Sequence, residues 1–212
     1  MGEIFRLGLV LMLVAVVAAV ALGIVNGKTA PIIALQKEQE KQDAMRLVAM
    51  GLVEADSMRF DSLVVEGMQN PYASVDEELR VVKVSVPPDT SVAGYIFIAY
   101  GKGYSSTIQT MVAVDPEGTV AGTKILYQQE TPGLGANVTD PSKLTAAFIG
   151  RSADEILLRK DGGDIDAMTG CTITSRAVTV SVRKGLQAMA EAGLFRGTGD
   201  TDSGEVREGG VE

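Results

Sequence analysis

An uncharged, apolar run from Leu7 to Val25 most constrains how this chain can fold. A helix over this run is about 28 Å long at roughly 1.5 Å per residue, enough to cross the hydrocarbon core of a bilayer. The alternative is a cleaved signal peptide, whose apolar region is normally shorter, about 7–15 residues, and ends in small residues. Ala19-Val20-Ala21 offers such a cleavage site. We expect an uncleaved transmembrane helix over residues 7–25.

The charges beside this run give a weak indication of its orientation. Arg6 and the terminal amine precede it and Lys28 follows it, and positive charge favours the cytoplasmic side. Because one N-terminal span is followed by a large C-terminal region, we expect residues 1–6 in the cytoplasm. The remainder would lie on the extracytoplasmic (periplasmic) side of the cell (inner) membrane, as in a single-pass protein.

The composition excludes several kinds of partner and site. The net charge is −8 and the isoelectric point is about 4.7, which argues against nucleic acid because no basic stripe is present. The chain has no histidine and one cysteine, so it lacks the parts of an intrachain disulfide, a Cys/His zinc site, a Ser-His-Asp triad or an iron–sulfur cluster. We therefore predict no metal site and no catalytic side chain; redox or group-transfer chemistry must come from an organic cofactor.

After the apolar run we expect a stalk or linker over residues 26–62. Apolar residues recur at helical spacing from about Thr29 to Met50, with Pro31 placed to occupy a first helical turn. At the other end, residues 195–212 are rich in Gly, Asp and Glu with almost nothing apolar. That composition is typical of a disordered tail.

Residues 63–194 read as one α+β domain built on an antiparallel sheet with flanking helices. Alternating or β-branched runs predict strands at 79–86, 92–100, 107–114 and 119–127. Asp115-Pro-Glu-Gly118 is a strong turn signal, so the last two of these strands should form a hairpin. We also expect a short helix from Ser142, a strand over Glu155–Arg159 and a final helix over Arg176–Leu194.

Two stretches of this domain suggest a ligand site. In residues 169–175 four hydroxyl side chains and one glycine precede the final helix, for which Ser175 or Thr174 is a natural N-cap. A helix N-terminus binds phosphate readily, although an ordinary capped helix explains the same residues. In Glu130-Thr-Pro-Gly-Leu-Gly135, glycines allow a flat aromatic ligand to approach the backbone, although a simple turn is the alternative.

The first stretch resembles a known motif. Asp166-Ala-Met-Thr-Gly-Cys-Thr172 is similar to the flavinylation motif of FMN-binding-domain proteins, in which a flavin transferase joins FMN through its phosphate to the final threonine. That residue is Thr172 here. Cys171 stands where the family usually has alanine; cysteine is a small hydrophobe, so we expect it to be tolerated.

The resemblance extends over roughly residues 1–194. Gly101-Lys-Gly-Tyr104, the hairpin, the 130–135 loop and Lys160-Asp-Gly-Gly-Asp164 follow in the family's order. They resemble one branch in particular, the G subunits of Rnf-type ion-pumping ferredoxin:NAD oxidoreductase complexes. The resemblance implies a membrane-bound electron relay with covalent FMN, other membrane subunits of an ion-transporting complex as partners, and a flavin transferase for maturation.

The resemblance also implies roles for individual residues. Thr172 would carry FMN as a phosphoester, and Asp166 would serve motif recognition and turn geometry. Thr169, Gly170 and Thr174 would border the phosphate. The residues expected to flank the isoalloxazine are Glu130, Thr131, Gly133, Leu134 and Gly135, with Tyr104 packed nearby. Lys102 would neutralise phosphate charge if it is not simply an exposed lysine at a strand end.

Three alternatives remain open on the sequence. The C subunit of sodium-pumping NADH:quinone oxidoreductase shares the domain but is usually longer. A flavin-free, membrane-anchored scaffold module would be consistent with Cys171. A stand-alone membrane-tethered flavoprotein would carry the same motif without partner subunits.

Overall fold

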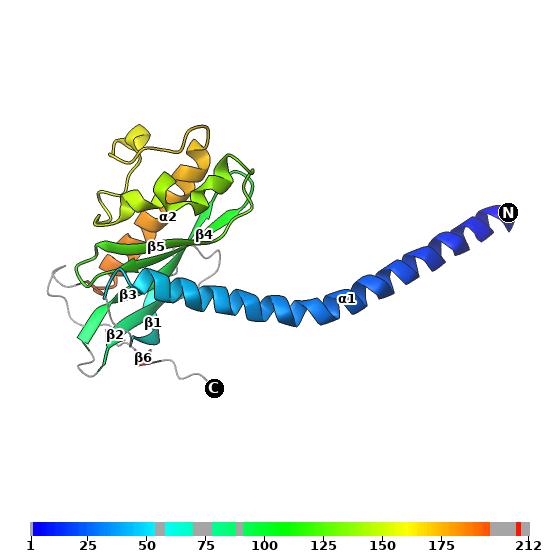
Figure 1. The fold of residues 1–212 in the computed structure, drawn as a ribbon, viewed down its shortest axis with the longest axis horizontal. Coiled ribbons are helices and arrows are strands. Elements are labelled where there is room, and N and C mark those ends of the chain that lie inside the picture. Colours follow the sequence, from blue (N-terminus) through cyan, green and yellow to red (C-terminus); the bar gives the residue numbers. More distant parts are fainter. Residues whose placement is uncertain (1, 54–57, 70–77, 88–90, 196–206, 209–212) are drawn as a thin grey trace. The chain divides into compact units, whose positions relative to one another are not determined.

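The computed structural model describes residues 2–53, 58–69, 78–87, 91–195 and 207–208 (Figure 1). The chain divides into two compact units, residues 1–42 and residues 43–212. The expected span and stalk belong mostly to the first unit, and the sheet and the candidate site belong to the second.

The N-terminal element is one continuous helix, α1 (Gly2–Ala49), which passes through Pro31. The expectation that a new helix begins with Pro31 in its first turn was wrong. A proline inside a helix removes one backbone hydrogen bond, and the residues on both sides of Pro31 are good helix formers, so the helix continues. Among the described residues, α1 is the helix long and apolar enough to cross a membrane, with a mean hydropathy of 3.0 over its most apolar window.

The sheet of the second unit contains β1 (Arg59–Gln69), β2 (Glu78–Val86), β3 (Ser91–Lys102), β4 (Thr107–Val114), β5 (Val120–Tyr127) and the two-residue β6 (Arg207–Glu208). The strand order is β5-β4-β3-β2-β1-β6, and all neighbouring pairs are antiparallel. The four predicted strands and the β4–β5 hairpin are confirmed. The predicted stalk overlaps β1, which begins at Arg59; of the predicted disordered tail, residues 196–206 and 209–212 lie outside the described residues.

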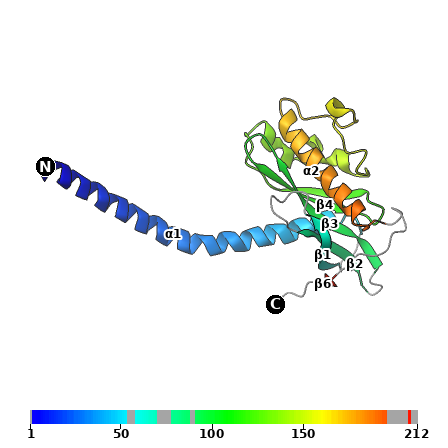
Figure 2. The ribbon, with the colours of Figure 1, turned by 180° about the vertical axis from the view of Figure 1, so that it is seen from behind.

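Successive residues of the central strands pack on opposite faces of the sheet. Phe97 and Val112 belong to a main core on the face that α2 (Thr172–Glu191) covers, whereas Ile96 and Met111 pack with the end of α1 through Val48. Figure 2 shows α2 lying across β3 and β4. A side chain at Gly101 of β3 would collide with the Ala177 carbonyl of α2, so this glycine permits the close approach that fixes the helix on the sheet.

The segment between β5 and α2 is less regular than we expected. The predicted helix from Ser142 is a pair of 3-10 turns, η2 (Pro141–Lys143) and η3 (Thr145–Phe148), preceded by η1 (Gly135–Thr139). The predicted strand over 155–159 was wrong: it is a single parallel bridge from Leu158 to Ile165, followed by η4 (Arg159–Asp161). Buried Ile156 and Leu158 alternate with more exposed neighbours as in a strand, but a single bridge is the only ladder they form among the described residues.

The final helix begins at Thr172 and ends at Glu191, so the predicted range of 176–194 was displaced. The predicted N-caps were wrong as well, because Cys171 occupies the N-cap position and makes no side-chain capping bond. Ser175 instead lies inside the first turn, where its hydroxyl accepts the Met168 N–H and donates to the Cys171 carbonyl, both at 3.0 Å. This pair of bonds ties the loop before α2 to the helix.

Candidate functional site

A cleft of about 540 Å³ opens beside the N-terminus of α2. Its walls come from the β3–β4 connection, the loop after β5, η4 and the first turn of α2. Eight of the predicted site residues line it: Tyr104, Glu130, Thr131, Leu134, Gly135, Gly170, Thr172 and Thr174. Segments distant in the sequence therefore meet where the motif analysis placed a ligand.

Three predicted site residues do not line the cleft: Gly133, Asp166 and Thr169. Asp166 is exposed and pairs with Arg159, whose Nε lies 2.8 Å from Asp166 Oδ1. The carbonyl of Thr169 accepts the Cys171 thiol at 3.5 Å. Asp166 and Thr169 thus fix the loop that leads into α2.

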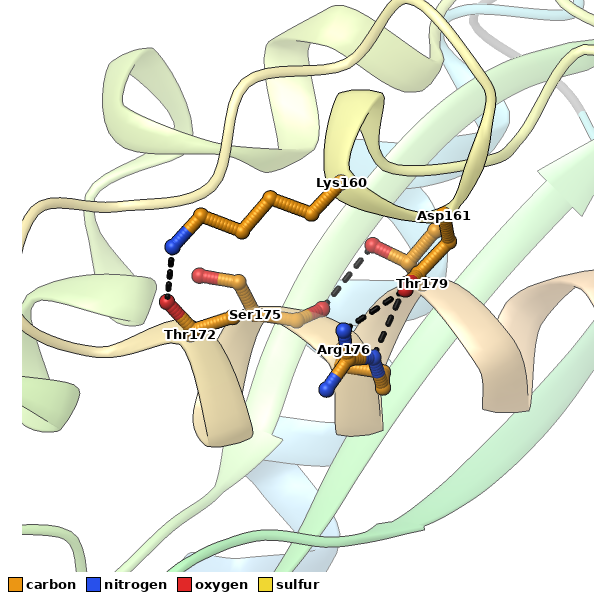
Figure 3. A network of polar contacts seen from close by, with 6 residues as sticks. All are labelled: Lys160, Asp161, Thr172, Ser175, Arg176 and Thr179. Carbon is orange, nitrogen blue, oxygen red and sulfur yellow. Dashed lines mark hydrogen bonds and ion pairs between the residues drawn. The ribbon is translucent and has the colours of Figure 1, made fainter.

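Thr172 is the first residue of α2 and is partly exposed in the cleft. The Lys160 ammonium donates to the Thr172 hydroxyl oxygen, with Nζ 3.2 Å from Oγ1 (Figure 3). The N–H groups of a first helical turn lack acceptors within the helix and carry partial positive charge. The Thr172 oxygen is therefore set in a locally positive environment that suits an attached phosphate.

A second contact joins η4 to α2 one turn further along the helix. Arg176 donates to the Asp161 carboxylate from Nη2 at 2.6 Å and from Nε at 2.8 Å. The hydrogen bond from Arg176 lowers the pKa of Asp161 below its usual value. Thr172 and Arg176 are four residues apart and share a helix face, so the consecutive residues Lys160 and Asp161 contact the same side of α2 (Figure 3).

Glu130 holds the opposite side of the cleft together, and it is only 6 % exposed. Its Oε1 accepts the backbone N–H groups of Ser105 at 2.9 Å and Ser106 at 3.0 Å. Its Oε2 accepts the Tyr104 N–H at 3.1 Å and the Thr174 hydroxyl at 2.8 Å. One carboxylate thus connects the β3–β4 connection, the loop after β5 and α2; we call these contacts the Glu130 clasp.

The protonation state of Glu130 follows from these contacts. Burial alone would raise the pKa of this carboxyl, but the hydrogen bonds from Thr174, Ser105, Ser106 and Tyr104 outweigh burial and lower the pKa below its ordinary value of 4.5. Glu130 is therefore ionised near neutral pH, and its charge is used by donors of the protein itself.

Glycines allow the backbone to come this close to the Glu130 carboxylate. A Cβ at Gly103 would lie 2.6 Å from Glu130 Oε1. A Cβ at Gly135 would lie 2.8 Å from the Thr174 hydroxyl and 2.9 Å from Glu130 Oε2. Any side chain at either position would push the clasp apart.

The mouth of the cleft is apolar. Tyr104 is 74 % exposed, Ile173 53 % and Leu134 48 %. Gly170, at a φ of +75°, turns the chain ahead of α2, and a Cβ there would lie 3.6 Å from Leu134. Exposed aromatic and aliphatic side chains at the edge of a polar recess suit a flat ring system attached to a phosphate.

Sequence reasoning missed the role of Lys160, and it left Cys171 and Ile173 out of the lining. Lys160 stands in the Lys160–Asp164 run that carried part of the resemblance, which was the available signal. Lys102, the expected phosphate partner, lines a neighbouring groove and not this cleft.

The residues present fit FMN on chemical grounds. The hydroxyl of Thr172, the ammonium of Lys160 and a helix N-terminus suit the phosphate, and the apolar mouth suits the ring. The volume falls within the range of about 300–1,000 Å³ that is usual for small-molecule sites.

Comparison with known proteins agrees with this chemistry. The family model of the FMN-binding domain matches residues 103–187, and that of the RnfG N-terminal region matches residues 1–48. Two solved structures share the fold. The NqrC protein of the Na⁺-translocating NADH-quinone reductase from Parabacteroides distasonis is 19 % identical with a TM-score of 0.53, covering 76 % of this chain and 94 % of that one. NqrC of Shewanella oneidensis is 20 % identical with a TM-score of 0.51, covering 69 % and 91 %.

Relatives with higher identity are G subunits. The chain is 31 % identical to the G subunit of the Na⁺-translocating ferredoxin:NAD⁺ oxidoreductase complex of Acetobacterium woodii, over 87 % of this chain and 90 % of the relative. It is 33 % identical to the G subunit of the proton-translocating ferredoxin:NAD⁺ oxidoreductase complex of Clostridium ljungdahlii, over 75 % and 77 %. With the G subunit of the Escherichia coli ion-translocating oxidoreductase complex it shares 40 % identity over 55 % of this chain and 56 % of the relative. The chain therefore belongs to the family of G subunits of Rnf-type ion-translocating oxidoreductase complexes.

Proposed function

We propose that this chain is the electron-relay subunit of an Rnf-type ion-translocating ferredoxin:NAD⁺ oxidoreductase complex and carries FMN covalently, as a phosphoester on Thr172. The observation that carries the proposal is the position of the Thr172 hydroxyl, at the first residue of α2, in the cleft and beside Lys160. Family membership supports the same function.

The residues of the cleft divide into those that hold the phosphate and those that shape the site. Thr172 provides the ester oxygen, while Lys160 and the first turn of α2 offset the phosphate charge. Thr174 belongs to the Glu130 clasp, so both residues position the walls. Leu134, with Thr131 and Gly135 beside it and Tyr104 opposite, provides the surface for the ring. FMN, when bound, supplies one- and two-electron transfer.

Attachment requires a separate enzyme. A threonine hydroxyl is a poor nucleophile without a base or a metal, and the contact made to Thr172 Oγ1 among the described residues comes from an ammonium donor. The ester forms when Oγ1 bonds to the phosphorus of an activated FMN donor, the donor's leaving group departs and the hydroxyl proton is lost. A flavin transferase supplies the donor and the base, and the exposed loop around Asp166 and Thr169 is available for it to recognise.

The apolar part of α1 gives the relay its place. Residues 7–25 anchor the chain in the cell membrane, the FMN-binding domain lies on the extracytoplasmic side, and other subunits of the complex exchange electrons with the flavin. Covalent attachment keeps in place a cofactor that would otherwise diffuse away outside the cytoplasm.

The test is the intact mass of the full chain purified from its native membrane, with peptide mapping. We expect a mass gain equal to FMN less one water, located on Thr172. Thr172→Ala should lose the covalent flavin completely while its circular dichroism spectrum stays that of the wild type. Thr172→Ser, which keeps a hydroxyl at the same place, should retain it. Covalent flavin on Thr172→Ala, or on another residue of the wild type, would contradict the assignment.

A further inference from the structure

Exposed apolar side chains gather around the mouth of the cleft. Within residues 58–195, the described large hydrophobic side chains that are exposed at or near the cleft are Tyr100, Tyr104, Leu134, Ile173 and Val180; the others, Tyr127 and Ile149, line neither the cleft nor the hollows beside it. Contiguous exposed apolar surface marks binding sites on soluble domains.

One hollow continues from the cleft along the outer face of α2. It has a volume of about 450 Å³ and shares Ile173 with the cleft. We call it the basic groove and define it by Tyr100, Lys102, Ile173, Arg176, Val180 and Lys184. Its apolar centre and the cleft mouth form one surface.

The ionisable side chains that line the basic groove are all cationic, apart from the Tyr100 phenol: Lys102, Arg176 and Lys184. Arg176 is paired with Asp161, which leaves Lys102 and Lys184 as the charges that the described contacts do not neutralise. The chain as a whole carries a net charge of −8. A local basic surface on an acidic protein favours an acidic partner, because complementary charge guides association and fixes orientation.

We propose that the basic groove is the docking surface for a neighbouring subunit of the complex, one that presents carboxylates around an apolar patch. The proposal rests on the proposed function only in that the chain acts within a complex. An apolar centre with a charged rim is the usual anatomy of a protein–protein interface. A subunit seated there also covers the cleft mouth at Ile173, which brings its own redox group to the flavin and excludes water from between them.

The test is zero-length carbodiimide cross-linking of the full chain in native membranes, which joins an amine to a carboxylate in direct contact. We expect Lys102 and Lys184 to be joined to aspartate or glutamate of another subunit, with a yield that falls as salt is raised. Lys143, an exposed lysine on η2 that lines none of these hollows, is the internal control.

Two matched variants keep both lysines and test the surface itself. Val180→Glu places a carboxylate in the basic groove and should lower the Lys102 and Lys184 cross-links at least tenfold. Ile149→Glu makes the same change at an exposed apolar residue elsewhere and should leave them unchanged. Equal effects of the two variants, or cross-links at Lys143 as abundant as at Lys102 and Lys184, would overturn the proposal.

The same measurement on Thr172→Ala separates this proposal from the proposed function. If the basic groove docks a subunit, the cross-links persist in Thr172→Ala membranes whether or not flavin is attached. Cross-links only between copies of this chain would overturn the proposal. So would lysine-dependent sedimentation with phosphatidylglycerol vesicles in the absence of carboxylate cross-links, which would assign the groove to lipid headgroups.

Discussion

The two sides of the cleft are built with the same kinds of side chain but in different surroundings. On one side the Glu130 carboxylate is buried and accepts hydrogen bonds from three backbone amides and Thr174. On the other, η4 is joined to α2 by Lys160 and by the pair of Asp161 with Arg176, whose side chains are 28 % and 45 % exposed. A buried charge that loses its donors is costly, whereas an exposed ion pair contributes little.

The difference assigns separate tasks to the two sides. The Glu130 clasp fixes the shape of the recess, while the η4 side carries the reactive Thr172 at a place that water and another enzyme can reach. A site that must be modified by a transferase needs one compliant side, and a site that must then hold the ring needs one rigid side. The following changes test that division, beginning with the largest expected effect on stability.

Glu130→Ala should lower the free energy of unfolding by about 3 kcal/mol, because it leaves several amides and the Thr174 hydroxyl without their acceptor. Urea unfolding of the full chain in detergent, followed by circular dichroism, measures this. Glu155→Ala is the control, since Glu155 also accepts an amide and a hydroxyl, both from Ser152, but is exposed. A loss as large in the control would show that burial of Glu130 is not what matters.

Gly135→Ala should lower the free energy of unfolding by about 1–3 kcal/mol, since the new methyl group would press on Thr174 and Glu130. Gly133→Ala is its matched partner two residues away. Gly133 has a φ of +75° but open space around its Cβ position, so that change costs only the backbone strain, about 1 kcal/mol. Thermal melts of both variants give the comparison, and a larger loss at Gly133 would refute the close contact at Gly135.

The stability contributed by Glu130 should depend on pH in a defined direction. Its pKa is lowered on folding from an ordinary value of 4.5, so the contribution is present above about pH 4.5 and is lost as the pH falls through the folded value. Glu130→Gln removes the titration. The difference in unfolding free energy between wild type and Glu130→Gln should therefore be constant from about pH 5 to 7 and shrink below about 4.5. A difference that grows in acid has the wrong sign for this account.

Asp161→Asn should have the smallest effect of the four. The pair with Arg176 is exposed and screened, so we expect the urea midpoint to stay at the wild-type value within error. Arg176→Gln should behave alike. A drop approaching that of Glu130→Ala would remove the contrast between the two sides of the cleft.

The sheet was predictable from the sequence because its strands carry their own signals. Alternation in β2 and the Asp115–Gly118 turn between β4 and β5 depend on neighbouring residues alone. The segment between β5 and α2 was not predictable, since Leu158 is buried by contacts with distant parts of the core. It therefore resembles a strand without having partners for a ladder.

The site was predictable only in part, for a similar reason. Motif spacing brought Thr172 and Gly170 into the prediction, and the structure places both in the cleft. That Glu130 would use its charge on the protein's own donors depends on a residue 44 positions away. That Lys160 and not Lys102 would reach Thr172 depends on how η4 lies against α2. No local pattern encodes either contact.

The Glu130 clasp also bears on when the protein can mature. Its bonds join residues separated by 24 to 44 positions, and contacts between such distant residues require that large loops close first. A nascent chain that has formed only its last helix presents Thr172 with no recess opposite. An enzyme that reads the completed recess would load flavin onto finished domains alone, so the cofactor would serve as a certificate of correct folding.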